Sequence, residues 1–297
     1  MKRIGLGFFV AFLTLFFFLP MPVKGDIGPK PSVVIDFVGF EEENYYSTLL
    51  SSTPSTGPYS VLSEEEYSQR YHEEDEDYHI WEKFVAYEDP DGYYFLQYFQ
   101  NCKDTSQFVW GYYPPQEFKI LLYFPDLDTF VVSAEPYERY AFDSYFRVDG
   151  KDLELLPNTI IEGIFAEKNY DYTWEIISLL ARIIATIAIE VLIALLLGLR
   201  GKSLLLFIAG VNIFTQSILN ILLNIINYNH GSMAFVFIYI LLELLIIAIE
   251  GGLYGKYLGR FSEKPLKKGY IWVYAIGANL ASLGMGIYIA KLVPGIF

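Results

Sequence analysis

The chain has 297 residues, of which 53% are hydrophobic and 18% aromatic, yet its formal net charge is −14. A disordered acidic chain lacks so many aromatic side chains, and one ordinary soluble domain does not explain the combination. The charge is segregated: residues 26–172 hold nine basic and 30 acidic residues, whereas residues 173–297 are net basic. So acidic a segment excludes nucleic acid as a partner, because phosphate binding needs clustered Lys and Arg.

Residues 1–25 predict a secretory signal peptide. Lys2 and Arg3 precede an apolar run, and small residues around position 25 favour cleavage before Asp26. An uncleaved anchor helix is the alternative, but the apolar run is shorter than the roughly 20 residues that a span requires. In both cases the chain from residue 26 onward leaves the cytoplasm.

Residues 26–172 predict a mainly-β extracytoplasmic domain with one amphipathic helix. Turn signals such as Asp89–Gly92 separate runs rich in Val, Ile, Phe and Tyr, which favours a small antiparallel sandwich or barrel. A capping box at Ser63 and Glu66 begins the predicted helix, which ends at Pro90. The predicted strands are Val33–Val38, Tyr45–Leu50, Tyr93–Phe99, Phe118–Phe124, Phe130–Ala134 and Tyr140–Val148.

The predicted helix carries the densest polar cluster of the chain. Its candidate ligands for a divalent cation are His72, Glu73, Glu76 and His79. A run of like charges is more often a solvated face, and the spacing matches no dedicated metal loop. Asp89, Asp91, Asp126 and Asp128 fit turns equally well. We therefore predict no cofactor.

Catalytic chemistry is poorly supported. Cys102 is the only cysteine, so the exported domain has no internal disulfide, and an inert thiol is the simpler interpretation. Two of the three histidines lie inside the acidic run, which argues against a hydrolase with a histidine base. Of the 25 tyrosines, 18 lie in residues 26–172, where binding surfaces and strand propensity both explain them.

Four apolar segments predict a four-helix transmembrane domain within residues 173–297. They span about 176–199, 204–226, 233–254 and 271–292, each long enough to cross a bilayer. Basic residues gather in loops 200–202 and 255–269, whereas loop 227–232 has none. The positive-inside rule therefore predicts a multi-pass plasma-membrane protein with its N-terminal domain and C-terminal tail outside.

Polar residues recur at helical spacing inside these spans. Ionised groups at this depth cost roughly 2.5–3.5 kcal/mol each, so the polar faces must turn toward one another. The predicted intramembrane polar core consists of Arg182, Thr186, Glu190, Asn212, Gln216, Asn220, Asn224, Glu243, Glu250 and Asn279.

Depth in the membrane predicts which of these residues meet. We expect an Arg182–Glu243 ion pair, and a Glu190–Glu250 carboxylate pair near Asn212. One carboxyl of the second pair should be protonated, because adjacent like charges disfavour joint ionisation.

Two interpretations of the polar core stay open. It is a proton path, ion path or substrate site, or it is interhelical packing in which Gly251, Gly255 and Gly259 allow close helix approach.

Three phrases carry a resemblance: Asp26-Ile27-Gly28-Pro29-Lys30-Pro31-Ser32, Ser55-Thr56-Gly57-Pro58, and Asn212-x-x-Thr215-Gln216-x-x-Leu219-Asn220. With them the chain resembles a group of exported multi-span membrane proteins of low-GC Gram-positive bacteria. The resemblance implies a cell-envelope setting in a bacterial plasma membrane, a signal peptide, one exterior domain and a small helical bundle. It carries over no catalytic residue.

Together these features predict a receptor-like or complex-forming membrane module that is not an enzyme. An exterior domain would bind a ligand or partner and be coupled to the polar-cored bundle through a short linker. The expected partners are the lipid bilayer and either a protein partner or a second copy of the chain. A small proton- or cation-coupled transporter, or a subunit of one, is the alternative, and an intramembrane hydrolase is a weak third.

Overall fold

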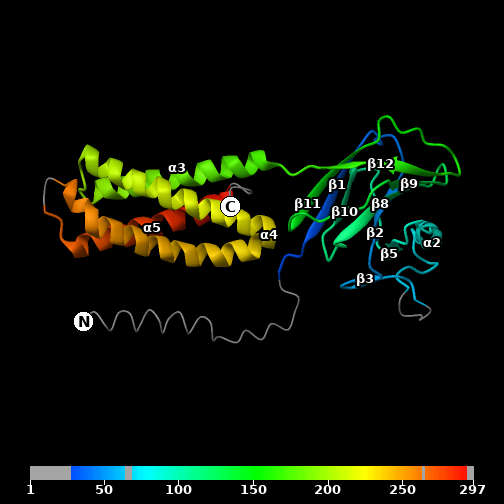
Figure 1. The fold of residues 1–297 in the computed structure, drawn as a ribbon, viewed down its shortest axis with the longest axis horizontal. Helices are drawn as coiled ribbons and strands as arrows, with labels where there is room; N and C mark the ends of the chain where they lie inside the picture. The colour runs from blue at the N-terminus through cyan, green and yellow to red at the C-terminus, as the bar shows by residue number, and fades with distance from the viewer. Residues whose placement is uncertain (1–27, 64–68, 263–264, 293–297) are drawn as a thin grey trace.

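A computed structural model describes residues 28–63, 69–262 and 265–292. The predicted signal peptide therefore lies outside the described residues. The chain forms a mainly-β domain followed by a helical region, and the two lie end to end along the long axis of the molecule (Figure 1).

The β domain is built from strands of very unequal length. They are β1 (Ser32–Val38), β2 (Tyr46–Ser51), β3 (Ser55–Thr56), β4 (Tyr59–Ser60), β5 (Tyr94–Phe95), β6 (Gln100–Asn101), β7 (Gln107–Trp110), β8 (Glu117–Phe124), β9 (Thr129–Ser133), β10 (Tyr137–Glu138), β11 (Asp143–Asp149), β12 (Ile160–Ile164) and β13 (Ala166–Lys168). One sheet has the order β13-β11-β1-β7 and the other β12-β9-β8-β2-β5, with β10 added on β8 and β6 on β2, while β3 and β4 form a separate hairpin.

The two sheets face each other, as the predicted sandwich requires. Alternate residues of β1, such as Val33 and Ile35, share one buried cluster with Ile120 and Leu122 of β8. The prediction of an antiparallel fold was wrong for two pairings, because β1 pairs with β11 and β12 pairs with β9 in parallel, whereas the other strand pairs are antiparallel. The two parallel pairings join strands that are distant in the chain, which turn signals do not reveal.

The amphipathic helix covers the outer face of the larger sheet. Helix α2 (Tyr78–Ala86) buries Ile80, Trp81 and Phe84 against Leu121 of β8. The predicted helix began at Ser63, which was wrong for residues 69–77, where the chain forms turns. Five consecutive acidic residues at 73–77 explain the late start, because like charges repel on a helix surface and Asp disfavours helix interiors.

The helical region contains α3 (Tyr172–Leu196), α4 (Lys202–Tyr257), the short 3-10 helix η2 (Leu258–Arg260) and α5 (Lys268–Leu292). Helix α4 reverses direction at Gly231, whose φ of 78° and ψ of 177° are not helical. The Asn212 amide therefore reaches the Tyr254 hydroxyl at 3.0 Å, although a straight helix would separate these residues by about 63 Å. The two limbs of α4 thus lie side by side with α3 and α5 (Figure 1).

The reversal of α4 lies against the β domain. The Phe142 N–H donates to the Tyr228 carbonyl at 2.8 Å, and a Cβ added to Gly231 would lie 2.6 Å from the Phe142 ring. The ring of Tyr170, which precedes α3, contacts the Tyr228 ring at 5.3 Å between centroids. At the opposite end of the helices lie the α3–α4 connection and η2 (Figure 1).

Candidate functional site: the polar core of the helical region

The helical region is apolar outside and polar inside. Leu196, Ile184 and Phe214 are 76%, 66% and 65% exposed, whereas Glu190 and Asn212 are fully buried. Two helices are long and apolar enough to cross a membrane, and only 17% of their most apolar windows is buried. A soluble helical domain buries its apolar side chains instead.

Glu190 of α3 is held by the first limb of α4. The Asn212 Nδ2 donates to Glu190 Oε2 at 2.8 Å, and the same amide nitrogen contacts the Tyr254 hydroxyl and the Ile208 carbonyl. The Tyr274 hydroxyl of α5 donates to the backbone carbonyl of Glu190 at 3.4 Å. All four helical segments therefore meet around Glu190 and Asn212.

Both carboxyl oxygens of Glu250, in the second limb of α4, have a hydrogen-bond partner. The Thr215 hydroxyl donates to Oε1 at 2.6 Å, and the Asn279 amide of α5 donates to Oε2 at 2.8 Å. Since Thr215 follows Asn212 by three residues on the same face, the two glutamates occupy neighbouring levels of one network. The structure thus brings Glu190, Glu250 and Asn279 together near Asn212.

The end of the polar core nearer the β domain has different chemistry. The Arg182 guanidinium donates to Asn224 Oδ1 at 3.0 Å and lies 5.8 Å from the centre of the Phe235 ring. Glu243 is buried and hydrogen-bonded by Tyr239, which is one turn earlier in α4. The Arg182–Glu243 ion pair stays a prediction.

The remaining predicted members lie between these two levels. Gln216 and Asn220 are buried, and the Asn220 amide donates to the Gln216 carbonyl at 2.8 Å. Thr186 is half-buried. These contacts within one helix fit a packing role as well as a chemical one.

Several polar atoms of this network have no hydrogen-bond partner within the described part of the chain. They are Glu190 Oε1, Asn212 Oδ1, Gln216 Nε2, Glu243 Oε2 and Asn279 Oδ1. An unsatisfied polar atom in a protein interior costs about 1–3 kcal/mol, so a further hydrogen bond at these atoms would stabilise the helical region.

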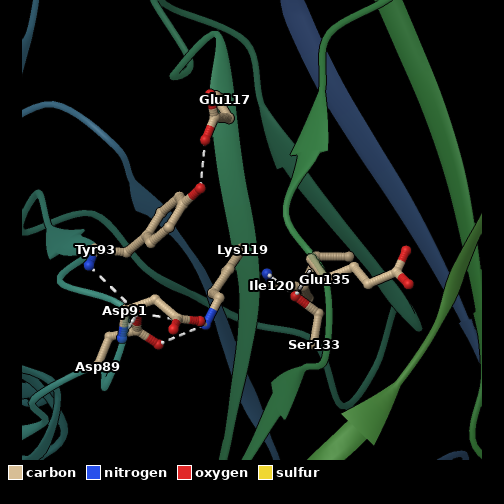
Figure 2. Close-up of polar contacts among 8 residues, drawn as sticks. All are labelled: Asp89, Asp91, Tyr93, Glu117, Lys119, Ile120, Ser133 and Glu135. Atoms are coloured by element: carbon tan, nitrogen blue, oxygen red, sulfur yellow. Dashed lines mark hydrogen bonds and ion pairs between the residues drawn. The ribbon is translucent and has the colours of Figure 1, made fainter.

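The β domain holds a second polar cluster, which is ionic rather than acidic. The Lys119 ammonium lies 3.2 Å from Asp89 Oδ1 and also contacts Asp91, and the Tyr93 hydroxyl donates to Glu117 beside them (Figure 2). Burial lowers the pKa of Lys119, but the hydrogen bonds to Asp91 and Asp89 outweigh it and raise that pKa above its ordinary value. Asp89 and Asp91, two of the aspartates that the sequence offered as metal ligands, therefore bind a lysine.

The other candidate metal ligands stay apart. His72, Glu73, Glu76 and His79 are exposed, and the Asp75 carboxylate accepts from the His72 N–H at 2.8 Å. Within residues 28–63, 69–262 and 265–292 no group of three or more His, Cys, Asp or Glu is arranged to hold a metal ion.

Three members of the polar core are absent from the predicted set. They are Tyr254, Thr215 and Tyr274, whose hydroxyls contact Asn212, Glu250 and the Glu190 carbonyl. The sequence contains a signal for two of them. Tyr254 follows Glu250 by four residues and Thr215 follows Asn212 by three, so each lies on the polar face of its helix. Comparison with known proteins finds no matching family model, no similar curated protein and no similar solved structure.

Proposed function

We propose that this protein is an integral membrane protein in which α3, the two limbs of α4, and α5 form four transmembrane helices. The inverted distribution of side chains supports this proposal, because lipid solvates apolar side chains and drives polar ones into the bundle. All four spans of such a bundle carry buried polar groups that contact one another.

The charge distribution along the bundle supports the proposed orientation. The α3–α4 connection, the start of α4, η2 and the segment that leads into α5 lie at the end remote from the β domain (Figure 1), and they carry Arg200, Lys202, Arg260 and Lys267. The α4 reversal lies at the other end, against that domain. The positive-inside rule therefore puts the basic end in the cytoplasm and the β domain outside the cell.

The function that this arrangement supports best is that of a receptor-like or complex-forming membrane module. The observation that carries it is the contact between Phe142 of the β domain and the Tyr228–Gly231 reversal of α4. A shift of the exterior domain would be transmitted directly to both limbs of α4, and through them to the polar core. An open cavity of about 630 Å³, lined among others by Arg147, Asp152 and Phe165, is of the size that small ligands occupy.

Complementation in cells that depend on the gene tests this function. The full chain should restore growth, whereas a chain lacking residues 28–168 and the Phe142→Ala variant should both fail while reaching the membrane in normal amounts. Leu156→Ala, at a side chain that is 49% exposed and does not line the open cavity, serves as the control. Full rescue by the membrane half alone would disprove a role for exterior binding.

A second candidate function is proton- or cation-coupled transport, and the Glu190–Glu250 network favours it. Carboxyls buried among apolar helices mark proton and ion pathways. Four spans are few for a monomeric carrier, so this candidate requires a second copy of the chain or a partner subunit.

Flux measured in proteoliposomes distinguishes the two candidates. A transporter should give pH- or cation-dependent flux that Glu190→Gln and Glu250→Gln each abolish. A receptor-like module should give no such flux from the wild-type protein.

A further inference from the structure

The two carboxyls at the centre of the polar core differ in their hydrogen-bond donors. Both oxygens of Glu250 have a hydrogen-bond partner, Thr215 at 2.6 Å and Asn279 at 2.8 Å, and the single Thr215 hydroxyl proton is shared with the Val211 and Asn212 carbonyls at 3.0 and 3.3 Å. Glu190 has a donor on Oε2 alone, and its Oε1 has no partner although the side chain is fully buried. The pair is therefore asymmetric in donors rather than in burial.

Asn212, the partner of Glu190, also has an acceptor atom without a donor. Its Oδ1 is also buried and without a partner, while its Nδ2 donates to Glu190. Because the Nδ2–Oε2 hydrogen bond already joins these two side chains, a proton on Glu190 Oε1 can be shared with Asn212 Oδ1, which gives the carboxylic acid and the primary amide a cyclic pair with two hydrogen bonds. The proton comes from water and forms an O–H bond at Oε1, and no other bond changes.

The opposite orientation of the Asn212 amide is disfavoured, because its oxygen would then face two acceptors, the Ile208 carbonyl at 3.1 Å and Glu190 Oε2 at 2.8 Å. A proton on Glu250, whose oxygens contact Thr215 and Asn279, adds no donor at Glu190 or Asn212.

The surroundings of Glu190 also favour a neutral acid. The titratable groups that face it from the other helices are Glu250 and Glu243 of α4 and the hydroxyls of Tyr254 and Tyr274. Arg182 is eight residues away on α3, about 12 Å along the helix axis. Neighbouring carboxyls disfavour joint ionisation, so one proton per pair is expected.

We propose that Glu190 and Asn212 form a proton-binding site, in which Glu190 holds the proton of the pair and Glu250 is ionised. Loss of that proton replaces one of the two hydrogen bonds between α3 and α4 with repulsion between acceptors. The site therefore couples protonation to the packing of α3 on α4. The inference rests on the proposed membrane bundle but requires no transport.

Infrared spectroscopy of the full-length protein in lipid nanodiscs tests the assignment at neutral pH. The wild type should show the C=O stretching band of a protonated, hydrogen-bonded carboxylic acid that shifts in D2O. Glu190→Gln should lose this band, because glutamine can reproduce the cyclic pair with Asn212 without a titratable group. Glu250→Gln should keep the band, and Glu243→Gln identifies any contribution from the third buried acid.

A second pair of variants keeps the test decisive if Glu190→Gln does not fold. Asn212→Leu removes the acceptor of the Glu190 hydroxyl and should move the band to higher frequency, whereas the matched Asn279→Leu should leave it in place. Loss of the band in Glu250→Gln, or its absence from the wild type, would overturn the assignment. Absence of the band from the wild type together with Na⁺-dependent spectral changes would overturn the proton site in favour of a bound cation. Failure of the proposed membrane function would appear in cysteine labelling and complementation, not in this spectrum.

Discussion

Lys119 shows how a single buried charge is stabilised in the β domain. Its side chain is 5% exposed and reaches Asp89, whose carboxylate is fully buried and also accepts the N–H groups of Asp91 and Tyr93. The strand around Lys119 is buried on both faces, so the lysine is retained by its partners and not by solvent. The sequence suggested neither this burial nor the pairing, because Asp89 and Asp91 have the features of ordinary turn residues.

Removal of this lysine should destabilise the β domain strongly. Lys119→Met leaves the Asp89 charge buried without its cation, which costs about 3–5 kcal/mol of unfolding free energy. Lys83→Met breaks a pair with Asp128 in which both side chains are 45% exposed, so it should cost less than about 1 kcal/mol. Urea unfolding monitored by tryptophan fluorescence compares the two, and equal effects would contradict the assigned role of Lys119.

Buried tyrosines predict a loss of stability at alkaline pH. Burial raises the pKa of Tyr98 and of Tyr140 to about 12, and their hydroxyls donate to the Val109 and Tyr145 carbonyls at 2.8 and 2.7 Å. Unfolded tyrosine ionises near pH 10, so the contribution of these residues is fully present below that pH and is lost as the pH rises toward 12.

Tyrosinate absorbance and near-ultraviolet circular dichroism, recorded together, test this expectation. Both signals should change in one transition between pH 10 and 12, and Tyr98→Phe should make the pH dependence of stability shallower. Ionisation of the buried tyrosines at pH 10 without loss of the dichroism signal would contradict it.

At the scale of elements, glycines decide how the helices pack. Of the three glycines predicted to allow close approach, Gly251 does so, because a Cβ there would collide with the Trp272 ring of α5. A Cβ added to Gly255 or Gly259 would meet no described atom of another element within 4 Å, so that part of the prediction was wrong. Helical spacing identifies a face but not which of its positions the neighbouring helix covers.

Adjacent glycines provide a matched test of this contact. Gly251→Ala should destabilise the α4–α5 packing by about 1–3 kcal/mol, because the ring of Trp272 has to move. Gly252→Ala faces open space and should be neutral or stabilise α4 by up to about 1 kcal/mol, because alanine favours helix. Thermal unfolding of the purified protein in detergent compares the two variants, and similar shifts would exclude a specific role for Gly251.

The whole molecule joins an acidic β domain to a helical bundle in which most basic residues lie at the far end. This arrangement resolves the contrast between a hydrophobic composition and a net charge of −14, because the two properties belong to different parts of the chain. The reversal of α4 connects those parts through Phe142 and Tyr228.

Cysteine labelling tests the proposed topology at this scale. Native Cys102 is buried, and burial raises the pKa of its thiol to about 12, so it should react slowly and provide a low background. A membrane-impermeant maleimide should label His230→Cys in intact cells, and Lys267→Cys only after the membrane is permeabilised. The reverse pattern, or labelling of both from outside, would contradict the orientation.

The sequence by itself determined the division of the chain, because charge, hydropathy and strand propensity are local properties. It also identified the faces of Glu190, Asn212 and Glu250, since helical spacing follows directly from the order of residues. The strands of β1, β2, β8 and β9 agree with prediction to within one residue at each end.

Only the tertiary structure decided which groups meet. The parallel pairing of β1 with β11 joins residues more than 100 positions apart, and the donors on Glu250 come from two different helical segments. Tyr254 and Tyr274 belong to the polar core for the same reason. Whether a tyrosine behaves as an apolar or a polar residue depends on which group its hydroxyl contacts. Glu190 and Glu250 differ in their hydrogen-bond partners. Those partners come within hydrogen-bonding distance only when the helices pack.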